Sequence, residues 1–211
     1  MMYPIDELVV RYPCLAGCKD TIEQAAAAII HCYEEGGKVL ICGNGGSCAD
    51  ADHMVGELMK GFRKNRPLSA SLREKLAKTG GKLGEEIAAA LQTPLAAINL
   101  CTHASLDTAF ANDADPALSY AQKALGYTDE NDVFIGISTS GNAKNVIRAG
   151  VTAKALGALT FGLCGEKPCD MDEFFDYVIH VPETETYRVQ ELHLPVYHAI
   201  CIAVEDHFFT E

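Results

Sequence analysis

The sequence lacks the features that mark a membrane protein or a nucleic-acid-binding protein. No apolar stretch reaches the roughly 20 residues needed to cross a bilayer. Lys and Arg number 17 against 29 Asp and Glu, which gives a formal net charge of −12. Binding to a phosphate backbone needs clustered basic residues, so this balance argues against nucleic acid or anionic membrane as the main partner. A small phosphorylated ligand is compatible with it, because a few backbone N–H groups can hold one phosphate.

The N-terminus also lacks a basic region followed by an apolar run, so we expect no secretory signal. The nine Cys are odd in number and scattered, and several, such as Cys42, sit in apolar runs. This usage predicts reduced thiols and a cytoplasmic location. Cys14 and Cys18 have the spacing to begin a zinc site, but no second pair at zinc-finger spacing follows. We therefore interpret the cysteines as small buried hydrophobes.

Internal repeats and low-complexity tracts are absent, and 211 residues with 48% apolar content fit one domain over residues 1–211. The segment 69–92 differs from its surroundings. It carries Leu at helical spacing, as at Leu72 and Leu83, with Gly80-Gly81 in the middle. We expect two short helices with a hinge, inserted into the domain as a lid, an oligomer contact or a passive surface feature.

Short, nearly continuous apolar runs alternate with helical patterns along the rest of the chain. This alternation predicts an α/β fold, with a doubly wound, parallel, five-stranded sheet and helices on both faces. The strands are expected at 38–42, 94–100, 132–137, 159–163 and 177–181. The helices are expected at 21–35, 50–62, 116–125, 142–156 and 186–208. Ligands of such sheets bind at the carboxyl ends of the strands, so loops that directly follow strands are the candidate sites.

Two such loops have the composition of a phosphate site. The first contains Asn44, Gly45, Gly46 and Ser47 between a strand and a helix, where glycines allow close backbone approach and the helix offers free N–H groups. It lacks the Lys of a nucleoside triphosphate loop and the spacing of a dinucleotide loop. The second loop contains Ser138, Thr139 and Ser140, which are neutral donors for a phosphate ester. An ordinary tight turn and ordinary helix caps are the alternatives.

Two helices carry side chains of the kinds that bind metals or move protons. His53 and Glu57 are four residues apart and share a helix face, while Gln190 and His198 are eight apart on the last helix. Two imidazoles, a carboxylate and an amide oxygen are suitable ligands for Zn²⁺, and Glu57 and His198 could instead transfer protons. Solvated helix surfaces are the alternative. Pro195 removes one backbone hydrogen bond between Gln190 and His198, so their alignment is approximate.

The remaining polar candidates carry weaker signals. Asn112 and Asp113 follow the second strand region and precede a capped helix, so they form a turn or contribute to a ligand site near the sheet. The other histidines pair with no second motif, and we interpret them as surface or partly buried side chains. They are His31, His103, His180, His193 and His207.

Taken in order, these motifs resemble the sedoheptulose 7-phosphate isomerases, also called phosphoheptose isomerases, of the sugar-isomerase (SIS) domain family. The resemblance is carried by the loop at 43–47 with His53 and Glu57, the pair at 112–113, the loop at 138–142, and the run at 188–191 with His198. It covers most of the chain, from about residue 21 to 208. Each motif is weak alone, and the ordered combination is specific.

The resemblance implies a flavodoxin-like fold and a homotetramer with active sites at subunit interfaces. It implies one zinc ion per subunit, and it implies that Glu57 and His198 act as the acid–base pair. The implied zinc ligands are His53, Glu57, Gln190 and His198. The implied sugar-phosphate contacts are Asn44, Gly45, Gly46, Ser47, Glu57, Asn112, Asp113, Ser138, Thr139, Ser140 and Gln190.

The activity implied by the resemblance is aldose–ketose isomerisation of a sugar phosphate. We expect sedoheptulose 7-phosphate to be converted through an enediol to D-glycero-D-manno-heptose 7-phosphate. The alternative is a non-catalytic SIS-domain protein that binds a sugar phosphate or a replication-initiator protein. The complete set of His53, Glu57, Gln190 and His198 favours the enzyme, because a protein that only binds has no physical need for it.

Overall fold

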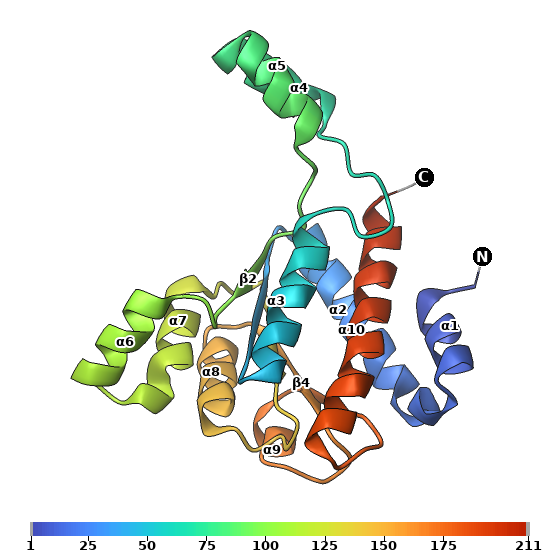
Figure 1. Ribbon diagram of the computed structural model, residues 1–211, viewed down its shortest axis with the longest axis vertical. Helices are drawn as coiled ribbons and strands as arrows, with labels where there is room; N and C mark the ends of the chain where they lie inside the picture. The colour runs from blue at the N-terminus through green and yellow to red at the C-terminus, as the bar shows by residue number, and fades with distance from the viewer. Residues whose placement is uncertain (1, 210–211) are drawn as a thin grey trace.

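A parallel sheet forms the centre of the molecule in the computed structural model, which describes residues 2–209 (Figure 1). Its five strands run in the order β2-β1-β3-β4-β5, and all neighbours are parallel. The fold class expected from the sequence is therefore confirmed. The strands are β1 (Val39–Gly43), β2 (Ala97–Asn99), β3 (Val133–Ile137), β4 (Leu159–Cys164) and β5 (Tyr177–His180).

The two faces of the sheet bury alternate residues of the same strand. In β1, Val39 and Ile41 belong to one hydrophobic core, which includes side chains of α2, α3 and α10. Leu40 and Cys42 belong to a second core, which includes side chains of α7 and α8. Both faces of β1 and β3 are buried, which explains why these strands are continuously apolar in the sequence.

The long helices lie close to their expected positions, with shifted ends. They are α2 (Lys19–Glu34), α3 (Gly46–Met59), α7 (Ser119–Tyr127), α8 (Lys144–Ala155) and α10 (Thr186–Phe208). Helix α2 begins at Lys19 rather than at residue 21, because it continues from a preceding 3₁₀ turn, Pro13–Cys18. Helix α7 begins at Ser119 rather than at residue 116, because residues 116–118 form a 3₁₀ turn. The carboxylate of Asp115 caps this turn and accepts the Ala117 N–H at 2.9 Å.

Three helices were not expected from the sequence: α1 (Pro4–Arg11), α6 (Ala104–Asp113) and α9 (Met171–Phe174). The last helix, α10, runs as one element although it contains Pro195. None of the described helices has the length and apolar character needed to cross a membrane.

The inserted segment forms a helical hairpin that projects from the body, and we call it the arm. It consists of α4 (Ala70–Gly80) and α5 (Lys82–Ala90), joined at Gly81, which has a positive φ of 54°. The expected pair of short helices with a hinge is thus confirmed. Pro67 and Gln92 pair through an antiparallel bridge at the base of the arm. The arm leaves the body at the end where α3 and α10 finish (Figure 1).

Candidate functional site

Both candidate phosphate loops lie at the carboxyl ends of neighbouring strands. The first follows β1 and the second follows β3, which is paired with β1. Strand β2 lies on one side of β1, and β3 lies on the other side. The order in which strands are added therefore reverses between β1 and β3. This is the point at which sheets of this type bind ligands. The two loops therefore face a common position, as expected from the sequence.

Side chains join the first loop to α8, the helix that follows the second loop. The amide groups of Asn44 and Asn145 exchange two hydrogen bonds of 2.9 Å, from the first loop to the start of α8. Gly45 adopts a positive φ of 54°, which lets the chain turn sharply into α3. Ser47 is buried, whereas Asn44, Gly45 and Gly46 are exposed and accessible to a ligand.

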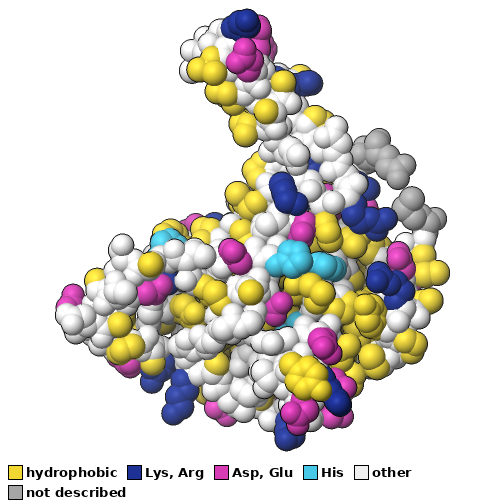
Figure 2. Space-filling model, in the orientation of Figure 1, with side chains coloured by type: hydrophobic (Ala, Val, Ile, Leu, Met, Phe, Trp, Pro, Cys, Tyr) yellow, Lys and Arg dark blue, Asp and Glu magenta, His cyan; other side chains and the backbone are white. Residues whose placement is uncertain are grey.

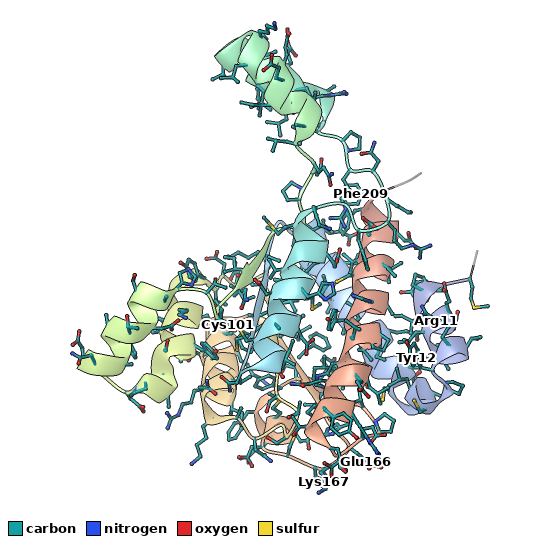
Figure 3. The ribbon with its side chains drawn as sticks, viewed as in Figure 1. Arg11, Tyr12, Cys101, Glu166, Lys167 and Phe209 are labelled. Atoms are coloured by element: carbon teal, nitrogen blue, oxygen red, sulfur yellow. The ribbon has the colours of Figure 1, made fainter. Side chains whose placement is uncertain are left out.

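The second loop borders a cavity of about 210 Å³. Thr139 and Ser140 line it from one side, and Glu166 and Lys167 line it from the loop that follows β4. Ser138 is buried below. Glu166 and Lys167 lie at the end of the body opposite the arm (Figure 3), so the arm does not cover this cavity in its own chain.

Helices α3 and α10 bring three of the predicted side chains together. His53 Nε2 lies 3.2 Å from Glu57 Oε1 and 3.5 Å from His198 Nε2. Glu57 is mostly buried, with 12% of its side chain exposed, and His53 is more open. Histidine side chains gather at the centre of the face shown in Figure 2, over α3 and α10. The sequence-based hypothesis that residues from two distant helices meet is consistent with this geometry.

A tyrosine fixes the orientation of His53. The Tyr197 hydroxyl donates to Asp50 Oδ1 at 3.3 Å and lies 3.0 Å from His53 Nδ1. These contacts hold the ring so that Nδ1 faces Tyr197 and Nε2 faces Glu57 and His198. Burial raises the pKa of Asp50, and its hydrogen bond from Tyr197 partly opposes this shift.

The donor set fits a metal ion on chemical grounds. A ring nitrogen of His53, a carboxylate oxygen of Glu57 and a ring nitrogen of His198 approach one another. Burial and the neighbouring His53 both lower the pKa of His198, which favours its neutral, ligating form. Electron-rich atoms that face one another are stabilised by a cation between them, and N and O donors of this kind suit Zn²⁺.

Three predicted site residues lie apart from this cluster. The amide of Gln190 packs against Gly46 at the start of α3, so that a Cβ atom on Gly46 would lie 2.3 Å from Gln190 Nε2. Asn112 and Asp113 are exposed at the end of α6, where Asn112 donates to the carboxylate of Asp113 at 2.8 Å. Figure 1 shows α6 at one side of the molecule, away from α3 and α10. Asn112 and Asp113 thus form the end of α6 rather than the expected turn.

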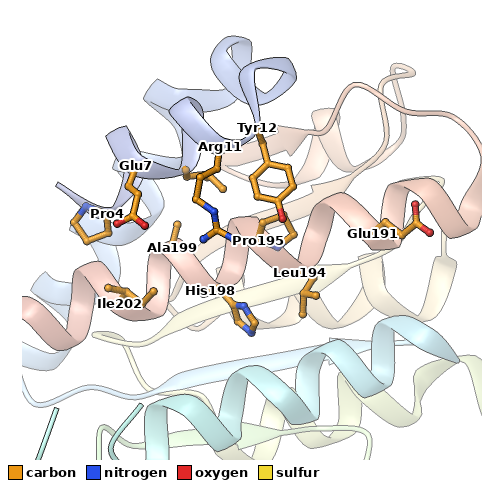
Figure 4. Close-up of a pocket in the computed structure, with 11 residues that line it drawn as sticks. Pro4, Glu7, Arg11, Tyr12, Glu191, Leu194, Pro195, His198, Ala199 and Ile202 are labelled. Atoms are coloured by element: carbon orange, nitrogen blue, oxygen red, sulfur yellow. The ribbon is translucent and has the colours of Figure 1, made fainter. Parts of the chain in front are cut away.

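A groove between α1 and α10 lies next to His198. Its volume is about 200 Å³, and its lining includes Glu7, Arg11 and Tyr12 of α1. Figure 4 shows that His198 points from α10 toward α3, whereas Arg11 and Tyr12 approach α10 from the other side. His198 thus lines this groove as well as the cluster, while His53 and Glu57 lie on the α3 side of α10.

One cluster was missed by the sequence analysis. Cys164, Cys169 and His180 bring two sulfur atoms and a ring nitrogen within 4.8 Å of one another. Cys164 and His180 are partners in the ladder between β4 and β5. Spacing along the chain does not show this pairing, because it depends on the register of two neighbouring strands.

Comparisons with known proteins place this geometry in a family. Two models of the SIS domain match the chain, at residues 15–79 and 107–203. Phosphoheptose isomerase 2 of Campylobacter jejuni is 36% identical over 89% of this chain and 81% of its own length. The phosphoheptose isomerase of Aneurinibacillus thermoaerophilus is 37% identical over 89% of this chain and 82% of its own length. The chain belongs to the phosphoheptose isomerase family of SIS-domain enzymes.

Solved structures of phosphoheptose isomerases share the fold. The enzyme from Neisseria gonorrhoeae is 27% identical, with a TM-score of 0.69 over 95% of this chain and 98% of its own. The enzyme from Francisella tularensis is 24% identical, with a TM-score of 0.72 over 97% of this chain and 100% of its own. The resemblance expected from the sequence motifs is therefore confirmed at the level of both family and fold.

Proposed function

We propose that the protein isomerises sedoheptulose 7-phosphate to D-glycero-D-manno-heptose 7-phosphate. Its membership of the phosphoheptose isomerase family supports the substrate class. The observation that carries the proposal is the approach of Glu57 and His198 to His53 from two different helices. A ketose phosphate becomes an aldose phosphate when a proton moves from C1 to C2, and this requires a carboxylate and an imidazole at one place.

In this proposal Glu57 and His198 move the protons. The Glu57 carboxylate accepts the proton from C1 and later returns it to C2. His198 delivers a proton to the C2 carbonyl oxygen and recovers one from the C1 hydroxyl, so the reaction consumes no co-reactant. The low exposure of Glu57 supports its role, because a carboxylate shielded from water returns the proton to the substrate rather than losing it to solvent.

The phosphate group is bound by the two loops in this proposal. Backbone N–H groups at Gly45 and Gly46 and hydroxyl groups at Ser47, Ser138, Thr139 and Ser140 provide neutral donors near the N-termini of α3 and α8. Asn44, Asn112, Asp113 and Gln190 contact the rest of the sugar. Anchoring the phosphate far from the reacting carbons makes the proton transfer effectively intramolecular.

We also propose one zinc ion per subunit, held by His53, Glu57, Gln190 and His198. Zinc would act as a Lewis acid and stabilise negative charge on the substrate oxygen. The orientation of His53 by Tyr197 supports its role as a ligand. Gln190 lies apart from the other three ligands within one chain, so the proposal includes a homotetramer with active sites at subunit interfaces. A cytoplasmic location stays a prediction from the sequence.

A non-catalytic SIS-domain protein is the weaker alternative. The relatives that match over most of the chain are named as isomerases. A protein that only senses a sugar phosphate needs the two loops but not a shielded carboxylate beside two imidazoles. The alternative predicts ligand binding without turnover, which makes the two functions easy to separate by assay.

The test is a panel of C5 to C7 ketose phosphates, with aldose products measured for the wild-type protein and for Glu57→Gln. We expect turnover with sedoheptulose 7-phosphate and a loss of about 10²- to 10⁴-fold in kcat for Glu57→Gln, the usual contribution of a general base. Glu74→Gln is the matched control, because Glu74 pairs with Lys78 on the exposed arm. Near-normal activity of Glu57→Gln would show that the proton-transfer role is wrong.

A further inference from the structure

Two cysteines and a histidine beside the second loop are arranged as metal ligands. Cys164 Sγ lies 3.9 Å from Cys169 Sγ and 3.3 Å from His180 Nδ1. In a tetrahedral zinc site, bond lengths of about 2.3 Å to sulfur and 2.0–2.1 Å to nitrogen separate neighbouring ligand atoms by about 3.5–3.8 Å. These two separations are close to those values, and all three ligand atoms lie within 4.8 Å of one another.

A carboxylate orients the histidine for ligation. Asp172 Oδ1 lies 2.7 Å from His180 Nε2, on the side of the ring opposite to the cysteines. Metal-bound histidines usually donate their second N–H to a carboxylate in this way. His180 Nδ1 lies 3.3 Å from Cys164 Sγ and also 2.9 Å from the carbonyl oxygen of Gly165, so a cation bound here would replace the hydrogen bond to Gly165.

The same carboxylate also holds the loop that carries the second cysteine. Asp172 Oδ2 accepts the backbone N–H of Cys169 at 2.8 Å. A cation bound here would be held by the thiolate forms of Cys164 and Cys169, so its binding releases protons.

The cluster is reachable from solvent. Cys164 is buried, whereas Cys169 and His180 are only partly buried. Three protein ligands leave one position of a tetrahedral site for water. No residue of this cluster belongs to the proposed catalytic set, so the inference does not depend on the proposed activity.

We propose that Cys164, Cys169 and His180 form a second metal site, which binds a thiophilic divalent cation of the Zn²⁺ class. This site braces the second loop from below. A Cβ atom on Gly141 would lie 2.1 Å from Cys169 Sγ, and the N–H of Met171 donates to the carbonyl of Gly141 at 3.2 Å. Binding of the cation therefore fixes the segment on which Ser138, Thr139 and Ser140 are held.

The experiment uses Co²⁺ added to the full-length, fully reduced protein, followed by absorption spectroscopy. Co²⁺ bound to thiolates gives an intense sulfur-to-metal charge-transfer band, whereas Co²⁺ bound to His, Glu and Gln does not. We expect the band in the wild-type protein and in Glu57→Gln. We expect it to be weaker in Cys169→Ser, which retains one thiolate, and in Cys164→Ser. Cys101→Ser is the matched control, because Cys101 is a half-buried thiol outside the cluster.

A further variant covers the case in which loss of a cysteine disturbs folding. Asp172→Asn keeps all three ligands and should weaken Co²⁺ binding by about 10- to 100-fold in competition with a chelator, the usual effect of removing such a carboxylate. Absence of the band in the reduced wild-type protein would overturn the proposal. So would a band that is unchanged in both Cys169→Ser and Cys164→Ser.

Discussion

At the scale of single residues, a fully buried ion pair between Arg66 and Glu205 links α10 to the end of α3. The Arg66 guanidinium lies 2.8 Å from the Glu205 carboxylate and donates to the carbonyl groups of Leu58 and Glu57. Burial would raise the pKa of Glu205, but the N–H groups of Phe62 and Arg63, followed by Arg66, outweigh it and lower the pKa. The pair thereby holds the backbone of the proposed general base.

Replacing Arg66 should be strongly destabilising. We expect Arg66→Ala to lower the free energy of unfolding by about 3–5 kcal/mol, because it leaves the buried carboxylate of Glu205 without its partner. Urea denaturation followed by circular dichroism measures the change. Lys78→Ala, which breaks an exposed pair with Glu74, should cost less than about 0.5 kcal/mol. Equal costs for the two variants would contradict this view of the buried pair.

The sequence predicted residues whose partners lie on regular helices and missed those whose partners lie across the sheet. His53 and Glu57 were found because a spacing of four places them on one helix face. Cys164 and His180 were not found, because the register of two parallel strands, and not their spacing, brings them together. Gln190 and His198 lie eight residues apart on α10, so they are separated by about two turns of one helix.

At the scale of elements, continuous apolar runs made the strands predictable, and the lack of such a signal hid α6. All five expected strands are present, and β1 and β3, which are buried on both faces, are apolar throughout. The segment of α6 (Ala104–Asp113) buries none of its residues, so it shows no hydrophobic stripe that would indicate a helix. Ends were predicted less well, as in α3, which begins at Gly46 rather than at Asp50.

The packing of α4 on α5 gives a prediction for the arm. A Cβ atom on Gly84 would lie 1.9 Å from the carbonyl oxygen of Leu76, so Gly84→Ala must push the two helices apart. We expect faster proteolysis within residues 70–90 than in the wild-type protein, with cleavage sites identified by mass spectrometry. Gly80→Ala is the control, because a Cβ atom there has no neighbour within 4 Å. The idea fails if both variants are cleaved at the wild-type rate.

At the scale of the whole molecule, the arm exposes apolar side chains that the body does not cover. Leu83 is 62% exposed and Leu91 is 52% exposed, and Leu72 and Ile87 are also exposed. Figure 2 shows hydrophobic side chains along the arm. The arm points away from the end of the body that carries the two loops, so it is not a lid over its own chain. An oligomer contact fits this placement best among the three interpretations of the insertion.

Deletion of the arm tests this interpretation. Residues 69–91 can be replaced by a short Gly-Ser linker, because Pro67 and Gln92 already lie side by side. We expect the shortened protein to form a smaller assembly, since it loses the exposed apolar surface, while its sheet stays folded. Analytical ultracentrifugation and circular dichroism measure the two quantities. An unchanged mass together with unchanged kinetics would identify the insertion as passive.

The bridge between Pro67 and Gln92 also bears on how the protein folds. Between these two residues the chain leaves the body and returns to the same place. The segment between Pro67 and Gln92 therefore acts as one closed loop between β1 and β2. Doubling the length of such a loop costs only about 0.6 kcal/mol in entropy. The sheet can therefore assemble while the hairpin is still unstructured. During synthesis, α4 and α5 are therefore free to form after the sheet.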